Sequence, residues 1–305
     1  MSSQCRGRLL LVVVPFAFLF LIHAPTLSRA AEPNEQPAAK KAGAEPVIAV
    51  THQEEPENGW FVAETTNFVL YHQLARDYAA SVLRIAERTR SAQLQKWFGE
   101  DENWSRKCRL ILYPSGEAYG EATGAPVHPA GGHTEITAEE GRVLSRCVHM
   151  HGRRTFLLKG ILPHEVTHAV LAGRLSSERM PRWADEGMAI LAESQAHIDV
   201  HYRHLPRWRD DDALFSVRDL IEMRDYPHPR SLGIFYAQSV SLVDFLTQQK
   251  GAKHFARFVR DGERDSYAAS LRKHYGWNFA ELDRRWQQHA FAAEQRLETA
   301  MPGGE

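Results

Sequence analysis

The sequence is poor in cysteine and has no excess of charge of either sign. Its 305 residues include 3 cysteines, and 37 lysines and arginines stand against 38 aspartates and glutamates, so the formal net charge is −1. This balance gives neither the excess of basic residues that is typical of nucleic-acid-binding proteins nor an acidic tail. No nucleic-acid partner is therefore expected. Internal repeats and sustained heptads are also missing, which argues against a solenoid or a coiled coil. What remains is a globular composition, with 43% apolar and 10% aromatic residues.

Long apolar runs are scarce, and the one that stands out lies at the N-terminus. Arg6 and Arg8 precede a run from Leu9 to Ile22, and small residues follow in Ser28-Arg29-Ala30. A basic start, a short apolar stretch and a small-residue end predict a signal peptide over residues 1–30 and an exported, periplasmic or secreted protein. The run is shorter than the roughly 20 residues that cross a bilayer. An uncleaved anchor is the alternative, and no later segment predicts a stable membrane span.

The remaining cysteines and the segment after the leader have little structure-forming pattern. Residues 31–58 are rich in Glu, Pro, Ala and Lys without apolar periodicity, which predicts a flexible linker before a domain at 59–298. Once the leader is removed, Cys108 and Cys147 remain. In an exported protein they are candidates for a disulfide, and two buried free thiols are the equally open alternative.

The ordered part reads as α+β, with strands first and helices after. Within a small α/β unit at 59–152, we expect strands at 67–71, 108–113 and 142–150, and a helix at about 75–98. Five glycines and prolines predict a loop over 123–134. Residues 153–298 are expected to be mostly helical. The expected helices are about 157–172, 182–195, 213–224, 233–249, 252–260, 266–274 and 278–297.

Histidine is abundant, with 16 residues, and two of them form a recognisable pattern. The segment His164-Glu165-Val166-Thr167-His168 fits H-E-x-x-H within an apolar stretch that predicts a helix. Residues four apart share one helix face, so both imidazoles can reach one metal ion, with Glu165 beside them as a candidate general base. Pro163 directly before His164 predicts a first helical turn or a kink.

A third ligand is needed, since catalytic zinc sites typically use three protein ligands and keep one position open. Glu186 lies eighteen residues after His168, on a helix that Pro181 begins. Its neighbour Asp185 is the alternative assignment, or a partner that hydrogen-bonds a ligating imidazole. A solvated glutamate near a helix start is the structural alternative for Glu186.

At these residues the sequence resembles the gluzincin metallopeptidases, most closely the Peptidase MA-like group. The resembling pattern is the H-E-x-x-H helix followed by a Trp-x-x-Glu-Gly-x-Ala helix, here at 183–189. The resemblance implies a zincin-like domain in which His164, His168 and Glu186 bind Zn²⁺ and Glu165 is the general base. It also implies that Tyr236, on a later helix, stabilises the oxyanion. A core tyrosine is the alternative for Tyr236, and His228 is a second candidate for its role.

The sequence departs from related patterns at two places. The segment Gly131-Gly132-His133-Thr134-Glu135 does not match the Gly-x-Met-Glu-Asn of gluzincin aminopeptidases, so that assignment is not supported. Ile190 occupies the place of the Asp that follows the third ligand in thermolysin-like enzymes, so the residue that orients His164 is not identified.

The other histidines are not assigned to the site. His197, His201 and His204 are interpreted as a solvated helix or loop face. His149 and His151 alternate with Met150 and point the same way, but the expected site already has three ligands.

The sequence thus predicts an exported zinc-dependent metallohydrolase, a peptidase acting on a peptide or protein substrate. The alternative is a catalytically silent envelope protein of the same fold that binds a peptide or glycan. A third possibility, a structural protein with histidines packed by chance, predicts no bound metal. Oligomeric state and substrate specificity do not follow from the residues.

Overall fold

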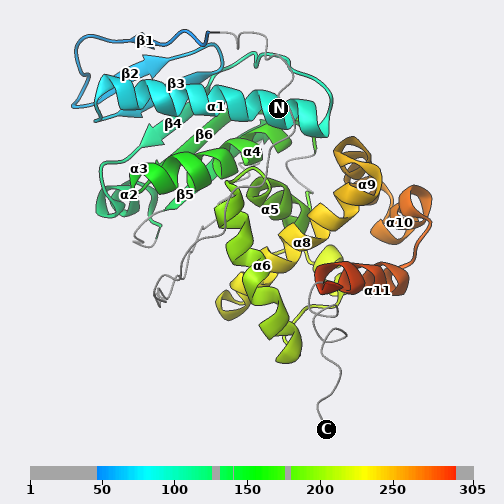
Figure 1. Ribbon diagram of the computed structural model, residues 1–305. Coiled ribbons are helices and arrows are strands. Elements are labelled where there is room, and N and C mark those ends of the chain that lie inside the picture. Colours follow the sequence, from blue (N-terminus) through cyan, green and yellow to red (C-terminus); the bar gives the residue numbers. More distant parts are fainter. Residues whose placement is uncertain (1–46, 126–130, 140, 176–179, 293–305) are drawn as a thin grey trace, which may run out of the picture.

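A mixed sheet of six strands precedes a mostly helical region in the computed structural model (Figure 1). The structure describes residues 47–125, 131–139, 141–175 and 180–292. The predicted signal peptide at 1–30 lies outside these residues, as does most of the predicted linker. None of the described helices has the length and apolar character needed to cross a membrane.

The sheet combines parallel strands at its centre with antiparallel strands at both edges. Its spatial order is β1-β2-β3-β4-β6-β5, with β3, β4 and β6 parallel and the other pairs antiparallel. Its strands are β1 (Thr51–His52), β2 (Phe61–Glu64), β3 (Phe68–His72), β4 (Cys108–Leu112), β5 (Gly131–Glu139) and β6 (Arg142–His151). The predicted strands correspond to β3, β4 and β6.

Two edge strands differ from the sequence expectations. Thr51–His52, inside the predicted linker 31–58, pairs with β2, so the linker prediction extends too far. The predicted loop at 123–134 is wrong for its last residues, because β5 begins at Gly131 and pairs along its whole length with β6. Glycine lowers strand propensity, but pairing with a long neighbour outweighs that local preference.

Cys108 and Cys147 are free, buried thiols. Of the two alternatives left open by the sequence, the structure therefore has the free thiols and not the disulfide. Cys147 lies opposite Arg109, not opposite Cys108, in the β4–β6 ladder. Because side chains alternate between the two faces of a sheet, this offset of one residue directs the two sulfur atoms to opposite faces.

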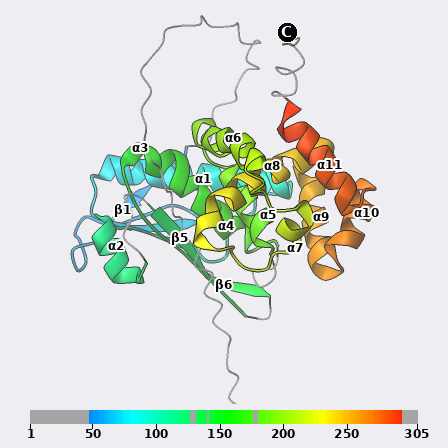
Figure 2. The same cartoon turned by 90° about the horizontal axis from the view of Figure 1, so that it is seen from below.

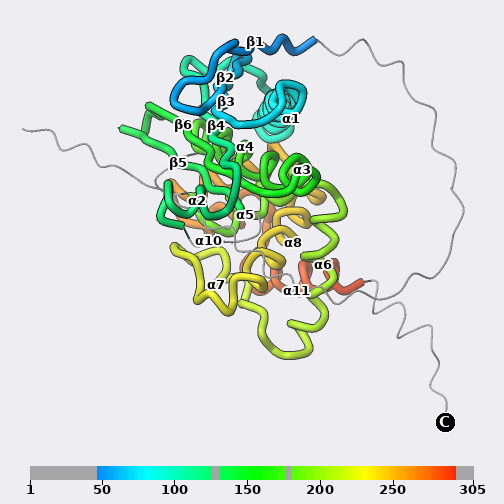
Figure 3. The backbone as a smooth tube through the Cα atoms, turned by 90° about the vertical axis from the view of Figure 1, so that its left-hand side faces the viewer, coloured from blue at the N-terminus to red at the C-terminus, as the bar shows by residue number. Residues whose placement is uncertain are grey.

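The two faces of the sheet have different covers (Figures 2 and 3). Helix α1 (Arg76–Trp97) packs on β2 and β3, and α4 (Leu162–Leu171) packs on β5 and β6. The other face meets α2 (Gly116–Thr123), whose Tyr119 hydroxyl contacts His133 on β5. The residues that alternate along β5 therefore face two different environments.

The helical region packs around the long helix α8. Helix α5 has its most extensive helix–helix packing with α8, and Gly187 allows this approach: a Cβ there would lie 2.5 Å from Val243 Cγ2. The helices are α5 (Arg182–Ile190), α6 (Gln195–Asp210), α7 (Val217–Glu222), η2 (Pro229–Ser231), α8 (Leu232–Lys250), α9 (Ala252–Arg264), α10 (Tyr267–Tyr275) and α11 (Phe279–Ala290). Apart from η2 and α6, which had no firm assignment, these correspond to predicted helices with shifted ends.

The helix predicted at 157–172 is composite. It contains α3 (Arg154–Phe156), a π-helical stretch η1 (Leu157–Ile161) and then α4. Pro163 lies in the first turn of α4, as predicted. Because proline has no N–H, it cannot bond the carbonyl of Lys159 four residues earlier, and the wider π-helical turn ends there.

Candidate metal centre

Helices α4 and α5 bring the two predicted histidines and Glu186 to one point. His164 Nε2 and His168 Nε2 lie 3.1 Å apart, and Glu186 Oε2 lies 3.3 Å and 3.8 Å from them. All three residues are buried, and donor atoms from the three lie within 4.8 Å of one another. The structure thus brings together all three of the predicted ligands.

Each imidazole has a buried carboxylate behind it. His164 Nδ1 is 2.9 Å from Glu193 Oε1, and His168 Nδ1 is 2.8 Å from Asp185 Oδ1. From the sequence, Asp185 is a candidate hydrogen-bond partner of a ligating imidazole, and this is the contact that it makes. Both partners orient the Nε2 atoms toward Glu186, the arrangement in which a histidine ligand is held from behind by a carboxylate.

The partner of His164 could not be found by spacing, because Glu193 lies beyond the end of α5. Pro163 explains its position. The Lys159 carbonyl left free by Pro163 accepts a hydrogen bond from the backbone N–H of Ser194 at 2.8 Å. This bond holds the segment at 193–194 against η1, so that Glu193 reaches His164.

The buried carboxylates of Glu193 and Asp185 lie against imidazoles in this centre, and each group shifts the pKa of its partner. Burial disfavours ionisation of Glu193, but hydrogen bonds from His164 and His197 outweigh it and lower the pKa of Glu193 to about 2. Burial likewise disfavours protonated His164, but Glu186 and Glu193 raise its pKa to about 10. These buried carboxylates therefore demand positive charge at the imidazoles, which a proton or a cation can supply.

Glu165 is positioned by the neighbouring edge strand. Thr134 Oγ1 on β5 donates to Glu165 Oε2 at 2.7 Å, while Glu165 Oε1 is buried with no hydrogen-bond partner among the described residues. Gly132 makes this contact possible, since a Cβ there would lie 3.1 Å from Glu165 Cγ. Burial raises the pKa of Glu165, against the opposing influence of His168 and His164. A carboxylate with one unbonded oxygen and a raised pKa is suited to accept a proton.

Two tyrosines lie near Glu186, and the sequence pointed to only one of them. Tyr226, in the segment between α7 and η2, donates a short hydrogen bond to Glu186 Oε1. Tyr236, on α8, is buried, and burial together with the charges of Glu186 and Glu165 raises its pKa well above the ordinary value. Tyr226 was missed because no motif surrounds it. The side chain of His228 instead accepts from the Arg230 backbone at the start of η2.

The donor set fits a divalent cation of the zinc class. With metal–nitrogen bonds of about 2.0–2.1 Å, tetrahedral ligand atoms lie roughly 3.3 Å apart. The three separations here, 3.1, 3.3 and 3.8 Å, are near that value. Glu186 Oε2 is buried and makes no hydrogen bond within the described part of the chain. Two imidazoles and one carboxylate oxygen are also the ligand types that zinc accepts.

The histidines of α6 are less uniform than expected. His204 is exposed, as a solvated face predicts, but His197 Nδ1 approaches Glu193 Oε2 at 3.3 Å. His201 is partly buried, and burial lowers its pKa to about 4. The prediction of a solvated face is therefore wrong for His197, which packs against Glu193, the hydrogen-bond partner of His164.

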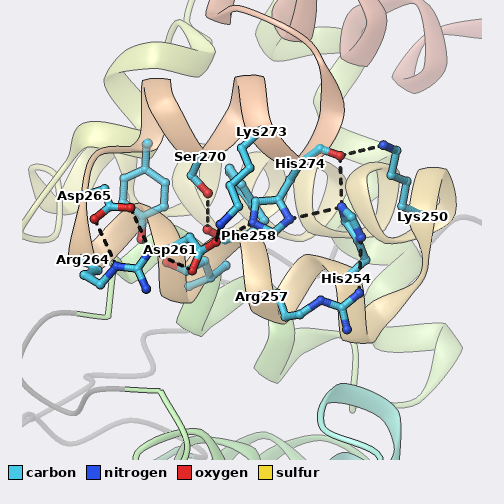
Figure 4. Close-up of polar contacts among 12 residues, drawn as sticks. Lys250, His254, Arg257, Phe258, Asp261, Arg264, Asp265, Ser270, Lys273 and His274 are labelled. Atoms are coloured by element: carbon cyan, nitrogen blue, oxygen red, sulfur yellow. Dashed lines mark hydrogen bonds and ion pairs between the residues drawn. The ribbon is translucent and has the colours of Figure 1, made fainter.

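A histidine pair on α9 and α10 belongs to a different kind of cluster (Figure 4). His274 Nε2 lies 2.9 Å from Asp261 Oδ2, Lys273 Nζ lies 2.6 Å from the same atom, and His274 Nδ1 lies 3.3 Å from His254 Nε2. One carboxylate is shared here by two donors, so these contacts join two helices and do not converge on an empty point.

Residues 150–292 match the sequence profile of the Peptidase MA superfamily. The match supports a zincin-like peptidase family, and it covers both helices of the metal centre together with the rest of the helical region. No curated protein was found to match the sequence.

Solved structures give weaker similarities. An M1 zinc metallopeptidase from Deinococcus radiodurans is 15% identical, with a TM-score of 0.37. A point mutant of that enzyme is 14% identical with a TM-score of 0.39, and a complex of the mutant with a Tyr-Ser-Ala substrate is 12% identical with a TM-score of 0.36. The alignments cover 78–79% of this chain, which spans about half the length of those chains, 51–52%.

Proposed function

We propose that this protein is a zinc-dependent peptidase in which His164, His168 and Glu186 bind the ion. The observation that carries the proposal is the convergence of three buried donor atoms at ligand spacing, with Glu165 beside them. The carboxylates of Asp185 and Glu193 support it, because they hold both imidazoles in the orientation a ligand needs. The profile match over residues 150–292 supports the reaction class.

A zinc ion bound there would polarise a substrate carbonyl and make a water molecule more acidic. Glu165 takes the proton of that water through its unbonded Oε1 and then delivers it to the leaving amine. Thr134 keeps the other carboxylate oxygen fixed by its hydrogen bond, which limits the carboxylate to one working orientation. The chain thereby supplies a positioned base next to His164 on the same helix.

Two further roles belong to the same proposal. Tyr236 stabilises the oxyanion of the hydrated carbonyl through its hydroxyl, supported by its burial near Glu165 and Glu186. Tyr226 is a positioning residue, since its hydroxyl holds Glu186 Oε1 and leaves Oε2 for the ion. We further propose that the substrate is a protein or peptide. We also propose that residues 1–30 direct export, which the basic start and the apolar run of this segment support.

The decisive test is Glu165→Gln. The variant should bind zinc as wild type does, because the ligands are unchanged, and should lose hydrolysis by on the order of 10²–10⁴-fold. Cleavage of a peptide library can be followed by mass spectrometry beside metal analysis of the purified proteins. His204→Gln, an exposed histidine of α6, is the matched control and should cleave at the wild-type rate.

Two results would contradict the proposal. Equal cleavage by wild type and Glu165→Gln removes Glu165 from the reaction. Absence of cleavage in zinc-loaded wild type, with a peptide or glycan still bound, would instead identify the silent binding protein.

A further inference from the structure

A second group of donor atoms lies on the opposite face of the sheet. Side chains alternate along β5, so that Thr134 contacts Glu165 beneath α4 while His133 and Glu135 point away from it. In the β5–β6 ladder His133 pairs with His149, and Glu135 pairs with Cys147. The register therefore gathers two imidazoles, a carboxylate and a thiol on the face that meets α2.

The two imidazoles approach the two oxygens of one carboxylate. His133 Nε2 lies 3.5 Å from Glu135 Oε1, and His149 Nε2 lies 3.6 Å from Glu135 Oε2. Contacts of this length are too long for good hydrogen bonds. They run to the two different oxygens of Glu135, and each is close to the roughly 3.3 Å that separates ligands in a tetrahedral zinc site. Donor atoms from the three residues lie within 4.8 Å of one another.

Each imidazole is also oriented from behind. Tyr119 Oη lies 2.6 Å from His133 Nδ1, and Tyr113 Oη lies 2.9 Å from His149 Nδ1. With Nδ1 engaged by a phenol, Nε2 of each ring faces Glu135. The two rings stack in parallel with centroids 4.7 Å apart, and the Nε2 atom of each lies near an oxygen of Glu135. Ligating histidines typically show this division of labour between their nitrogen atoms.

Burial and access suit a cation site. The His133 side chain is almost fully buried, His149 is 12% exposed and Glu135 is 36% exposed, so one side of the group opens to solvent. The Cys147 thiol lies beside the same point, with Sγ in hydrogen-bond contact with His149 Nε2 at 3.2 Å, and it would have to lose its proton to act as a ligand. Imidazole and sulfur donors select transition cations over calcium or magnesium, which prefer oxygen.

We propose that His133, Glu135 and His149 form a second cation site, selective for a divalent transition ion of the zinc class. It is separate from the centre between α4 and α5, because its residues face the other side of the sheet. A cation there would cross-link β5, an edge strand, to β6. The site does not depend on the proposed peptidase activity, since none of its ligands takes part in that reaction.

The test is metal stoichiometry on the full chain, stripped with a chelator and then equilibrated with Zn²⁺ alone. Wild type should retain about two ions per chain, and His149→Gln, Glu135→Gln and His164→Gln should each retain about one. His164→Gln combined with His149→Gln should retain none. His204→Gln, an exposed histidine of α6 that lies outside both groups, is the control and should retain two.

The outcomes separate the two sites. One ion in wild type that His164→Gln removes and His149→Gln does not would overturn the second site and leave the first intact. One ion in wild type that only His149→Gln removes would support the second site while refuting the peptidase centre. Circular dichroism of each variant checks folding, and the partly exposed Glu135→Gln provides the substitution with the smallest effect on packing.

Discussion

The two histidine clusters contain the same ligand types but differ in what stands behind them. Between α4 and α5, His164 and His168 are backed by the carboxylates of Glu193 and Asp185. On the far face of the sheet, His133 and His149 are backed by the phenols of Tyr119 and Tyr113. A hydrogen bond to a charged carboxylate is stronger than one to a neutral phenol. His164 and His168 should therefore bind a metal ion more tightly than His133 and His149 do.

Position in the fold adds a second difference. The first cluster is built on helices, is buried and has beside it Glu165, which Thr134 holds and for which we propose the role of base. The second is built on two strands, is partly open to solvent and has no comparable base in the described residues around it. If both proposals hold, ligand type alone does not distinguish a reactive centre from a site that only binds. The difference lies in the groups placed around the ligands.

The largest expected effect on activity comes from replacing the two tyrosines near the first cluster. Tyr236→Phe removes the proposed oxyanion donor and should lower kcat by on the order of 10²–10³-fold at saturating zinc. Tyr226→Phe loosens Glu186 and should lower zinc affinity, so that excess zinc restores its rate. Steady-state kinetics over a zinc series measures both. Rescue of Tyr236→Phe by zinc would show that it acts through the ligands.

A smaller effect tests the partners themselves. Glu193→Gln should weaken zinc binding at the first cluster by about 10–100-fold, because it removes the charge that holds His164. Tyr113→Phe should weaken the second site by less, since a neutral partner is lost. Competition with a chromophoric chelator measures each affinity, using His149→Gln and His164→Gln backgrounds to isolate the sites. A greater loss from Tyr113→Phe would reverse the proposed order.

The smallest effect is expected at the α9–α10 contacts, which provide a reference without convergent ligands. Hydrogen bonds from Lys273 and His274 lower the pKa of Asp261 from 3.8 to about 2. A lowered pKa in the folded state gives stability that is present above pH 4 and lost as pH falls toward 2. Asp261→Asn should therefore cost less than about 1 kcal/mol near neutral pH, because the ion pair is close to the surface.

Urea unfolding at a series of pH values checks this prediction. The difference in unfolding free energy between wild type and Asp261→Asn should shrink between pH 4 and pH 2. A difference that stays constant over this range would show that ionisation of Asp261 contributes nothing to stability.

Periodicity identified most of the regular structure but failed where neighbours decide the conformation. The helix expected at 75–98 is α1 (Arg76–Trp97), and the helix expected at 233–249 is α8 (Leu232–Lys250). The pattern of α1 specifies one buried face, whereas α8 is apolar along most of its length and buried on all sides at 235–243. In contrast, the loop predicted at 123–134 overlaps the first residues of β5, since glycines obscure the strand pattern there and the partner strand lies later in the chain.

The same division applies to the candidate site. Two histidines four residues apart on one helix face, with a glutamate between them, follow from the sequence alone because helical geometry is local. Tertiary structure decided the rest. Glu193 reaches His164 through the carbonyl that Pro163 leaves free, Tyr226 meets Glu186 from a loop, and strand register assembles His133, Glu135 and His149. These contacts join residues far apart in the chain, and no local propensity encodes them.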